Sequence, residues 1–381
     1  MSTLEIKVVR LKIEAHANAD KLEIAKIADS EYIAVVGKGQ FKDNDLSIFI
    51  PEDAVVPQKI QDYLAKTSKI NADKGRIRCS KIRGVFSDGL CLTPIDWLPP
   101  EMIKDGQDIG EYLGIIKYEP PPPRMSGFGP KSKGVNFNYE NPNFREFSDI
   151  ENIKKHSRVF EYGEQVIATL KYHGQNFRAG IVKRPPSYYT WWEKLKSWFG
   201  FPPKSMEYLV GSHYRIKKIG KHATKVKDTF IDMANKYDLE DILIALQQES
   251  KTNDKLPEVM IYGEVVGPGI QSGYAYGIKE GEHELRIFAF TVDGKYLNRD
   301  DVVRICSINH LPCVEQVYRG PWSLDVLKLA EAVDEYNGQK YVREGIVITS
   351  DQERKDPKLG RVILKAISET FRLDKTNSSF H

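Results

Sequence analysis

The sequence predicts an α+β protein in which a small β-barrel precedes a larger, mixed α/β domain. Two observations support this fold class. Residues 4–92 contain five short β-rich runs with polar connections, and from residue 147 onward strand-like and helix-like runs are mixed. A stretch rich in proline, glycine and asparagine lies between the two patterns. At 381 residues the chain is long enough for two or three domains, each with its own core.

The five β-rich runs are the evidence for the barrel. In the first of them, apolar residues recur at Ile6, Val8, Leu11 and Ile13, the approximate alternation of a half-buried strand. The others are residues 22–27, 32–36, 46–50 and 89–92. We expect residues 1–117 to form this barrel domain.

The boundary is predicted at residues 118–146, which begin with Tyr118, Glu119 and four successive prolines. Such a stretch cannot form a helix and favours an extended linker or a strap. Residues 147–381 are then expected to form the second domain and to carry the chemistry.

Three features of the second domain are predicted from composition and periodicity. An aromatic-rich insertion spans residues 184–203, with a short amphipathic helix over 191–199. Residues 225–248 predict one or two helices that pack on a sheet, and residues 325–333 predict another. The insertion's aromatic side chains favour contact with a core or a partner over stacking on RNA.

Composition sets limits on function. A net charge of +3 and a pI near 8.4 are too mild to indicate a nucleic-acid binder by themselves, so a binding surface must come from local clustering. The four cysteines show no C-x-x-C spacing and read as reduced thiols. No signal core or apolar span is present. We expect a soluble, intracellular monomer with no membrane partner.

Lys171 is the residue around which the second domain is interpreted. The apolar run before it predicts a strand that ends at this lysine, Gly174 allows a close approach of the backbone, and residues 177–182 resume a strand. An amine at such a position can act as a nucleophile if its pKa falls from the usual ~10.4. The alternative is a solvated turn lysine, which this stretch alone favours.

The segment Lys171-Tyr172-His173-Gly174-Gln175-Asn176-Phe177 resembles motif I of the ATP-dependent RNA ligases, which reads K-x-H-G-T-N-F or K-x-D-G. The later motifs of the RNA ligase 2 group follow in family order. The segments that resemble these motifs are residues 262–271 (Y-G-E-V-V-G-P-G-I-Q), 286–290 (R-I-F-A-F), 343–348 (R-E-G-I-V-I) and 363–366 (I-L-K-A). The ordered set is a far more specific signal than a single K-x-H-G.

This resemblance implies an activity and an architecture. Lys171 would attack the α-phosphorus of ATP to form lysyl-AMP, the adenylate would pass to an RNA 5′-phosphate, and a 3′-hydroxyl would then seal the strand. The second domain would have the ATP-grasp-like ligase fold of a covalent nucleotidyltransferase. An OB-fold domain in front of it matches the layout of the fifth RNA ligase family.

The resemblance also implies roles for charged residues. Glu264 would contact the nucleotide sugar and, together with Glu344, place a catalytic Mg²⁺ or Mn²⁺. Lys365 would contact the α-phosphate. The second lysine that RNA ligase 2 carries two residues later is replaced here by Ile367.

Other positions of the nucleotide site follow the motifs less closely. Adenine would be covered by Ile287 or Phe288, and the motif does not decide between them. His173 and Gly174 belong to motif I, where Asn176 would contact a substrate phosphate. Arg215 lies where a phosphate ligand of motif Ia is expected. Leu170 replaces a common glutamate, which leaves the choice of purine open.

The amino-terminal domain has its own resemblance. Residues 16–23 and 82–90 are similar to the OB folds of tRNA-binding modules. Between and within them lies a basic cluster, predicted to contact the RNA backbone. Its candidate members are Lys74, Arg76, Arg78, Lys81 and Arg83. A solvated loop is the alternative for any one of these side chains.

Two other functions stay open. A capping-type guanylyltransferase would label its lysine from GTP, but only 16 residues follow Lys365 (381 − 365), too few for the carboxy-terminal OB domain of capping enzymes and DNA ligases. A non-catalytic RNA-binding protein with a degenerate transferase domain is the second alternative. The presence of Lys171, Glu264, Glu344 and Lys365 argues against it.

Overall fold

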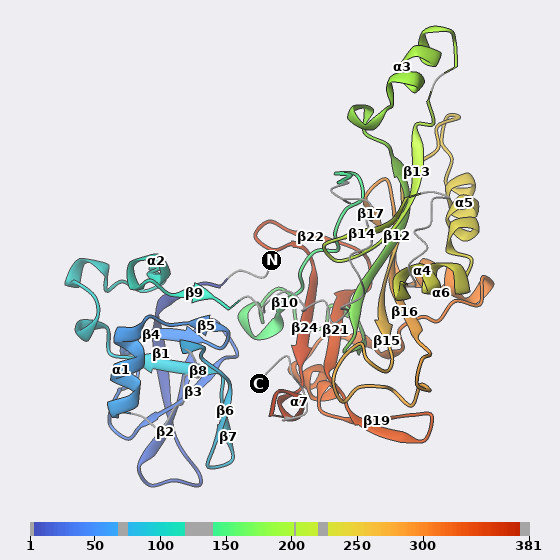
Figure 1. Ribbon diagram of the computed structural model, residues 1–381. Helices are drawn as coiled ribbons and strands as arrows, with labels where there is room; N and C mark the ends of the chain where they lie inside the picture. The colour runs from blue at the N-terminus through green and yellow to red at the C-terminus, as the bar shows by residue number, and fades with distance from the viewer. Residues whose placement is uncertain (1–3, 68–74, 119–139, 202, 220–227, 374–381) are drawn as a thin grey trace, which may run out of the picture. The chain divides into compact units, whose positions relative to one another are not determined.

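The computed structural model describes residues 4–67, 75–118, 140–201, 203–219 and 228–373 (Figure 1). The chain divides into two compact units. The first consists of Met1–Ser126, Asp149–Tyr162 and Ile363–His381, and the second of Gly127–Ser148 and Gly163–Val362. One segment from the middle of the chain and one from its carboxy-terminal end therefore join the unit that contains the barrel. The predicted boundaries at residues 117 and 146 stay a prediction, and most of the predicted linker lies outside the described residues.

The barrel of the first unit contains the five predicted strands. They are β1 (Lys7–Ala15), β2 (Leu22–Ile27), β3 (Ile33–Gly37), β4 (Leu46–Pro51) and β8 (Gly89–Leu92). All pairs are antiparallel, in the order β3-β2-β1-β4-β8. Alternating apolar residues fill the interior, as expected for a barrel with one buried face.

The sheet curls until its two edge strands meet. Asp88 N donates to Ile33 O at 2.8 Å, and Ser87 Oγ accepts from Val35 N at 3.0 Å, so residues just before β8 bind the backbone of β3. Helix α1 (Gln58–Thr67) was not predicted, although Ile60 and Leu64 are buried in the barrel core. Its apolar positions are too few to stand out in the sequence.

Charged side chains connect the barrel with the other segments of the first unit. Strand β10 (Glu151–Asn152) pairs in parallel with β24 (Ile363–Ile367), and α7 (Glu369–Leu373) follows. Lys154 Nζ donates to the two carboxylate oxygens of Asp88 at 2.9 and 3.1 Å. Arg372 Nη1 donates to Asp88 at 3.0 Å, and its Nε donates to Glu52 at 3.1 Å.

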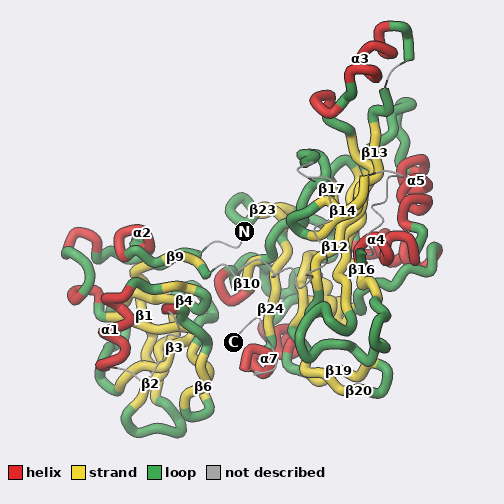
Figure 2. The backbone as a smooth tube through the Cα atoms, in the orientation of Figure 1, coloured by secondary structure: helices red, strands yellow, loops and turns green. Residues whose placement is uncertain are grey.

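The second unit is built on a six-stranded sheet whose edge strands are β14 (Ile216–Ile219) and β17 (Lys295–Tyr296). The strand order is β14-β13-β12-β15-β16-β17. Its main strands are β12 (Gln175–Lys183), β13 (Met206–Ser212), β15 (Val259–Val266) and β16 (Glu284–Val292). Three helices cover one face, α4 (Thr229–Lys236), α5 (Leu239–Glu249) and α6 (Arg299–Ile308) (Figures 1 and 2). A core that includes Phe177, Ile261 and Phe290 fills the layer between.

A second set of strands carries the lysine. Strand β11 (Gln165–Lys171) lies between β21 (Gly345–Ser350) and β18 (Gln316–Pro321), antiparallel to both. The remaining short strands and α-helices are β5 (Ala54–Val55), β6 (Ser80–Ile82), β7 (Val85–Ser87), β9 (Ile116–Lys117), β19 (Val333–Tyr336), β20 (Gln339–Val342), β22 (Lys355–Asp356), β23 (Gly360–Arg361), α2 (Gly110–Leu113) and α3 (Trp191–Trp198).

The helix predictions are confirmed at two places and wrong at a third. Helix α3 lies within the predicted range 191–199, and α4 and α5 fill most of 225–248. Residues 325–333 instead form a 3₁₀ helix, Leu324–Ala330, because only Val326 and Ala330 are buried and the chain then enters β19. No helix of the described residues is long and apolar enough to cross a membrane.

Candidate active site

Lys171 is held at the end of β11, where it faces β21. The register pairs Lys171 with Gly345, so Glu344 lies immediately before the paired residue. Lys171 Nζ is 2.6 Å from Glu344 Oε1, and His173 Nδ1 is 3.9 Å from the same oxygen. The Glu344 side chain is only 6% exposed, so the structure brings motif I and motif IV together in a buried ion pair.

Glu264 joins them through the neighbouring sheet. Strand β12 pairs Asn176 with Glu264 on β15. A Cβ atom at Gly174 would lie 2.3 Å from Val265 O and 2.7 Å from Glu264 Cγ. Only glycine allows this approach, which explains why the turn after Lys171 contains Gly174.

The two carboxylates control the charge of the lysine. Burial lowers the pKa of Lys171, but Glu344 and then Glu264 outweigh it, so the pKa lies above its usual value. Burial raises the pKa of Glu264 to about 8, against the opposing effect of Lys171. Burial and the charge of Lys171 lower the pKa of His173 to about 4. The resting site therefore contains a protonated lysine beside a neutral histidine.

Gln271, the last residue of the 262–271 motif, and two tyrosines that the sequence did not indicate hold motif I in place. Gln271 Nε2 donates to Gly174 O at 2.9 Å, and His173 N donates to Tyr276 Oη at 2.8 Å. The Tyr274 ring lies edge-on to His173, with centroids 5.2 Å apart. The signal available was the G-Y-A-Y run that follows motif III, where aromatic residues alternate in a loop.

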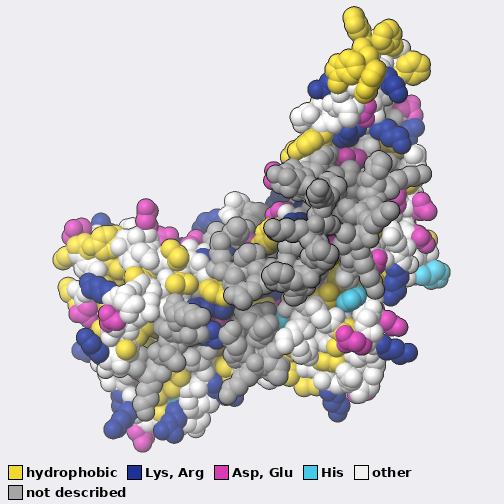
Figure 3. All heavy atoms as spheres, in the orientation of Figure 1, with side chains coloured by type: hydrophobic (Ala, Val, Ile, Leu, Met, Phe, Trp, Pro, Cys, Tyr) yellow, Lys and Arg dark blue, Asp and Glu magenta, His cyan; other side chains and the backbone are white. Residues whose placement is uncertain are grey.

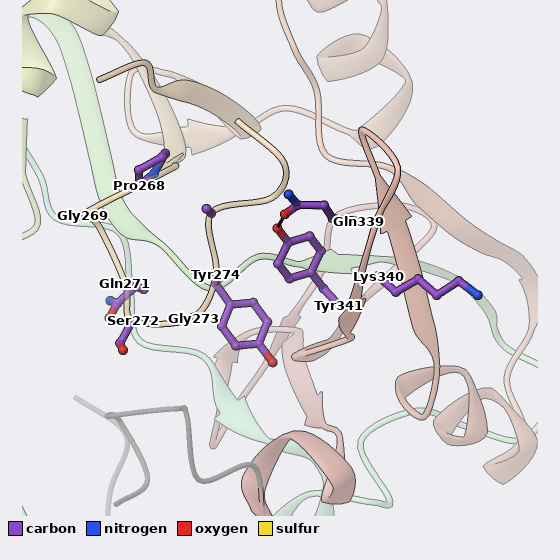
Figure 4. A pocket seen from close by; sticks show the side chains of 10 residues that line it. Pro268, Gly269, Gln271, Ser272, Gly273, Tyr274, Gln339, Lys340 and Tyr341 are labelled. Atoms are coloured by element: carbon purple, nitrogen blue, oxygen red, sulfur yellow. Dashed lines mark hydrogen bonds between the residues drawn. The ribbon is translucent and has the colours of Figure 1, made fainter. Parts of the chain in front are cut away.

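A hollow of about 780 Å³ opens beside these residues (Figure 4). It is lined by the loop after β15, including Gln271 and Tyr274, and by Gln339, Lys340 and Tyr341 of β20. Figure 4 shows the Tyr274 and Tyr341 rings close to each other, with Lys340 on the hairpin strand. Because Gln271 bonds to Gly174, the hollow borders the turn that follows Lys171.

The two candidates for covering the base lie on opposite faces of the sheet. Ile287 is fully buried in the core under the helices. Since side chains alternate along a strand, Phe288 lies on the other face, the one that Glu264 also uses. The Phe288 ring is half-buried, 4.8 Å from the Phe147 ring. Of the two, Phe288 is the better placed.

The remaining candidates of the nucleotide site differ in their placement. Asn176 Oδ1 is buried and has no hydrogen-bond partner in the described part of the chain, so it can accept from a ligand. Arg215 is exposed in the turn between β13 and β14. Lys365 lies on β24, opposite Asn152 of β10, and belongs to the first unit.

The basic cluster of the barrel is only partly available to a ligand. Arg76 is 7% exposed, donates to Asp53 and lies 3.8 Å from the Tyr118 ring centroid, so it stabilises the unit itself. Arg78 is half-buried, whereas Lys81 and Arg83 are exposed on the β6–β7 hairpin. Lys74 lies outside the described residues.

The predicted divalent cation would depend on the carboxylate oxygens near Lys171. Within the described ranges, no group of three or more His, Cys, Asp or Glu side chains is arranged to hold an ion. Glu264 and Glu344 nevertheless provide two carboxylates beside one lysine. Oxygen ligands of this kind suit Mg²⁺ or Mn²⁺, whose remaining positions are commonly filled by substrate phosphates and water. The residues therefore fit a metal that binds together with a nucleotide.

The fold as a whole matches solved RNA ligases. A structure of a Naegleria gruberi RNA ligase mutant with AMP and Mn is 19% identical, with 96% of this chain and 97% of that chain covered and a TM-score of 0.67. The Naegleria gruberi enzyme with PPi is also 19% identical, with 97% and 98% covered and a TM-score of 0.65. At this identity the likeness defines the fold.

The family follows from the sequence itself. Residues 164–367 match the RNA ligase family model, which covers more than half of the chain, and residues 5–95 match a model of an OB-fold domain. The chain belongs to the RNA ligase family. No curated protein matches it significantly. The predicted fold class, an OB-fold barrel followed by an α/β ligase domain, is confirmed.

Proposed function

We propose that this chain is an ATP-dependent RNA ligase that works through a covalent lysyl-AMP at Lys171. The observation that carries the proposal is the buried contact of 2.6 Å between Lys171 Nζ and Glu344, with Glu264 acting on the same lysine. Stability of the fold does not require two acidic side chains around one lysine at the end of a strand. A site that receives phosphates and a cation explains both.

In the first step, the Lys171 nitrogen forms a bond to the α-phosphorus of ATP, and the bond from that phosphorus to pyrophosphate breaks. The lysine must first lose a proton, and the existing hydrogen bond to Glu344 Oε1 gives that proton an acceptor. Lys171 remains as a phosphoramidate, and pyrophosphate leaves.

Glu264 and Glu344 are the residues that would hold a divalent cation. Its positive charge would offset both carboxylates, lower the pKa of Lys171 and neutralise charge on the phosphates. Glu264, with a pKa of about 8, is half-protonated near that pH and becomes a better ligand as pH rises. His173 stays neutral at such a pH, so it adds no competing charge.

The nucleotide would be bound by residues around the lysine. Gly174 lets the turn lie directly against β15, Asn176 Oδ1 accepts a hydrogen bond, and Phe288 covers the base, with Ile287 supporting that strand from the core. Lys365 would contact the α-phosphate, as the family motif implies.

The adenylate would then pass to an RNA 5′-phosphate, and attack by a 3′-hydroxyl would seal the strand and release AMP. We propose nicked or broken duplex RNA as the substrate of a monomer. Exposed Lys81 and Arg83 would contact the RNA backbone, and Arg78 and Arg215 are further candidates. Lys74, outside the described residues, stays a candidate from the sequence. Arg76 would support RNA binding indirectly, because its contacts with Asp53 and Tyr118 stabilise the barrel.

The test is labelling with α-labelled ATP and, separately, α-labelled GTP in Mg²⁺ or Mn²⁺. We expect label from ATP on the wild-type chain and none on Lys171→Ala. Label from GTP alone would indicate a capping-type enzyme. No label from either nucleotide, on protein freed of bound AMP, would indicate a non-catalytic RNA-binding protein.

A further inference from the structure

The aromatic insertion forms an exposed apolar tip. Helix α3 lies at the far end of the arm formed by β12 and β13, beyond the sheet (Figure 1). Figure 3 shows hydrophobic side chains gathered there, with Lys and Arg behind them. The exposed fractions are 65% for Trp191, 63% for Trp192, 85% for Trp198 and 70% each for Phe199 and Phe201. We call these five side chains the aromatic tip.

The helix does not need these rings in order to fold. Thr190 and Glu193 form a capping box, and Arg184 Nη1 donates to Glu193 at 2.6 Å. None of the eight helical residues is buried. Polar contacts therefore hold the helix in place while its apolar face stays in water. Exposing several large aromatic rings is costly, which is typical of a surface that meets a partner.

Charged and apolar side chains are segregated around the helix. At ~100° per residue, the three tryptophans and Leu195 span an arc of about 120°. Lys194 and Lys196 lie about 40° beyond the two edges of this arc, one on each side. Glu193 and Ser197 occupy the opposite face. Aromatic rings in the middle with a lysine on each flank are typical of a helix that lies in a membrane interface.

This pattern discriminates between classes of partner. A single-stranded nucleic acid would need cations among the rings, because phosphates alternate with stacked bases. A protein interface favours tryptophan but is depleted in lysine, and a second copy of the tip would bring like charges together. A lipid interface favours both, since indole rings sit at the headgroup level and lysines extend to anionic headgroups.

We propose that the aromatic tip inserts into the interface of an anionic lipid bilayer and binds the protein peripherally. The rings would enter the boundary between headgroups and acyl chains, and Lys194 and Lys196 would contact lipid phosphates. This surface differs from a membrane span, and it replaces the expectation of no membrane partner. The inference does not depend on the proposed ligase activity.

The test is flotation of the full chain with vesicles of phosphatidylcholine containing phosphatidylglycerol, and with vesicles of phosphatidylcholine alone. We expect binding to the anionic vesicles and a blue shift of tryptophan fluorescence, since three of the five tryptophans lie in the tip. The triple variant Trp192→Ala, Trp198→Ala, Phe199→Ala should lower the partition coefficient about tenfold or more. Replacing Lys194 or Lys196 by Ala should lower it roughly fivefold.

The matched control removes exposed apolar surface elsewhere. Tyr162 and Ile308 are 91% and 64% exposed, and their double alanine variant should float like the wild type. Self-adenylylation, if present in the wild type, should persist in the tip variants. A wild-type chain that does not float, or a triple variant that floats equally well, overturns the proposal. Tip variants that instead lose RNA binding or self-association also overturn it.

Discussion

Two clusters of buried charge, one in each unit, differ in how many carboxylates each cation binds. In the first unit, Lys154 donates to Asp88 and to Glu369, and Arg372 donates to Asp88 and to Glu52. Each cation is thus held by two carboxylates from separate segments. In the second unit, Glu344 is the acceptor that Lys171 has among the described residues, while Glu264 acts on it through its charge.

A shifted pKa does not distinguish the two clusters. Burial raises the pKa of Glu52 in the first, as it raises the pKa of Glu264 in the second. The difference lies in the surroundings. The second cluster adds a buried acceptor, Asn176 Oδ1, that has no partner among the described residues, and a glycine that lets the lysine's turn lie directly against β15. Cations that each bind two carboxylates indicate a structural role, whereas, in the described part of the chain, a lysine with one acceptor beside the unpaired Asn176 Oδ1 indicates a site for a ligand.

The largest expected effect comes from the same substitution in both clusters. Lys171→Arg keeps the positive charge and the pairing with Glu344 but removes the nucleophile, so self-adenylylation should fall by at least about 10⁴-fold. Lys154→Arg should keep the labelling, because arginine can still bind Asp88. The measurement is label per folded molecule. Equal labelling by Lys171→Arg and the wild type would show that the lysine is not the acceptor.

The next effect concerns stability. Arg372→Met would leave Asp88, which is fully buried, without one of its two cations. Loss of one partner of a buried pair costs about 3–5 kcal/mol of unfolding free energy. The control is Arg158→Met, whose pair with Asp29 is about four-fifths exposed and should contribute under ~1 kcal/mol. Urea unfolding checks both, and equal losses would contradict the structural role.

Gly174→Ala tests the close approach of the turn after Lys171 to β15. The added Cβ would meet Val265 O at 2.3 Å, so the turn or β15 must shift. A displacement of about 1 Å at the nucleophile should lower the labelling rate roughly 10²-fold. Gly37→Ala is the control, since its Cβ would meet nothing closer than 3.5 Å. An unchanged rate in Gly174→Ala would show that the close approach is not needed.

The smallest effect is a dependence of stability on pH. The pKa of Glu264 is about 8 in the folded chain, against the ordinary value of 4.5 that applies to the unfolded chain. A carboxyl whose pKa is higher in the folded chain contributes its full stabilisation at pH values below its unfolded-state pKa. This stabilisation is lost as the pH rises toward the folded-state pKa of about 8. Relative to the wild type, Glu264→Gln should therefore become more stable between pH 5 and pH 8, by about 1–2 kcal/mol.

Thermal unfolding at several pH values measures this trend. Glu335→Gln, at an exposed position on β19, is the control and should show no such trend. A stability difference for Glu264→Gln that stays constant with pH would mean that Glu264 does not titrate in this range.

Local patterns made the strands predictable and indicated which charged residues to consider as site candidates. Alternating apolar residues place β1 to β4, and ordered motifs indicate Lys171, Glu264 and Glu344 before their contacts are known. The cluster of Asp88 and Arg372 was not predictable, because 284 residues separate the partners in the sequence. The burial of Arg76 depends on Asp53 in the same way. Pairing across the fold decides which basic residues reach solvent, and local charge does not reveal it.

The central claim is that Lys171 carries the adenylate. The most direct measurement is mass spectrometry of the intact chain after incubation with ATP and Mn²⁺, followed by mapping of the modified peptide. We predict a mass increase of one AMP group, located on Lys171, that disappears on addition of pyrophosphate. An AMP adduct on another residue, or none on protein cleared of bound nucleotide, would contradict the claim.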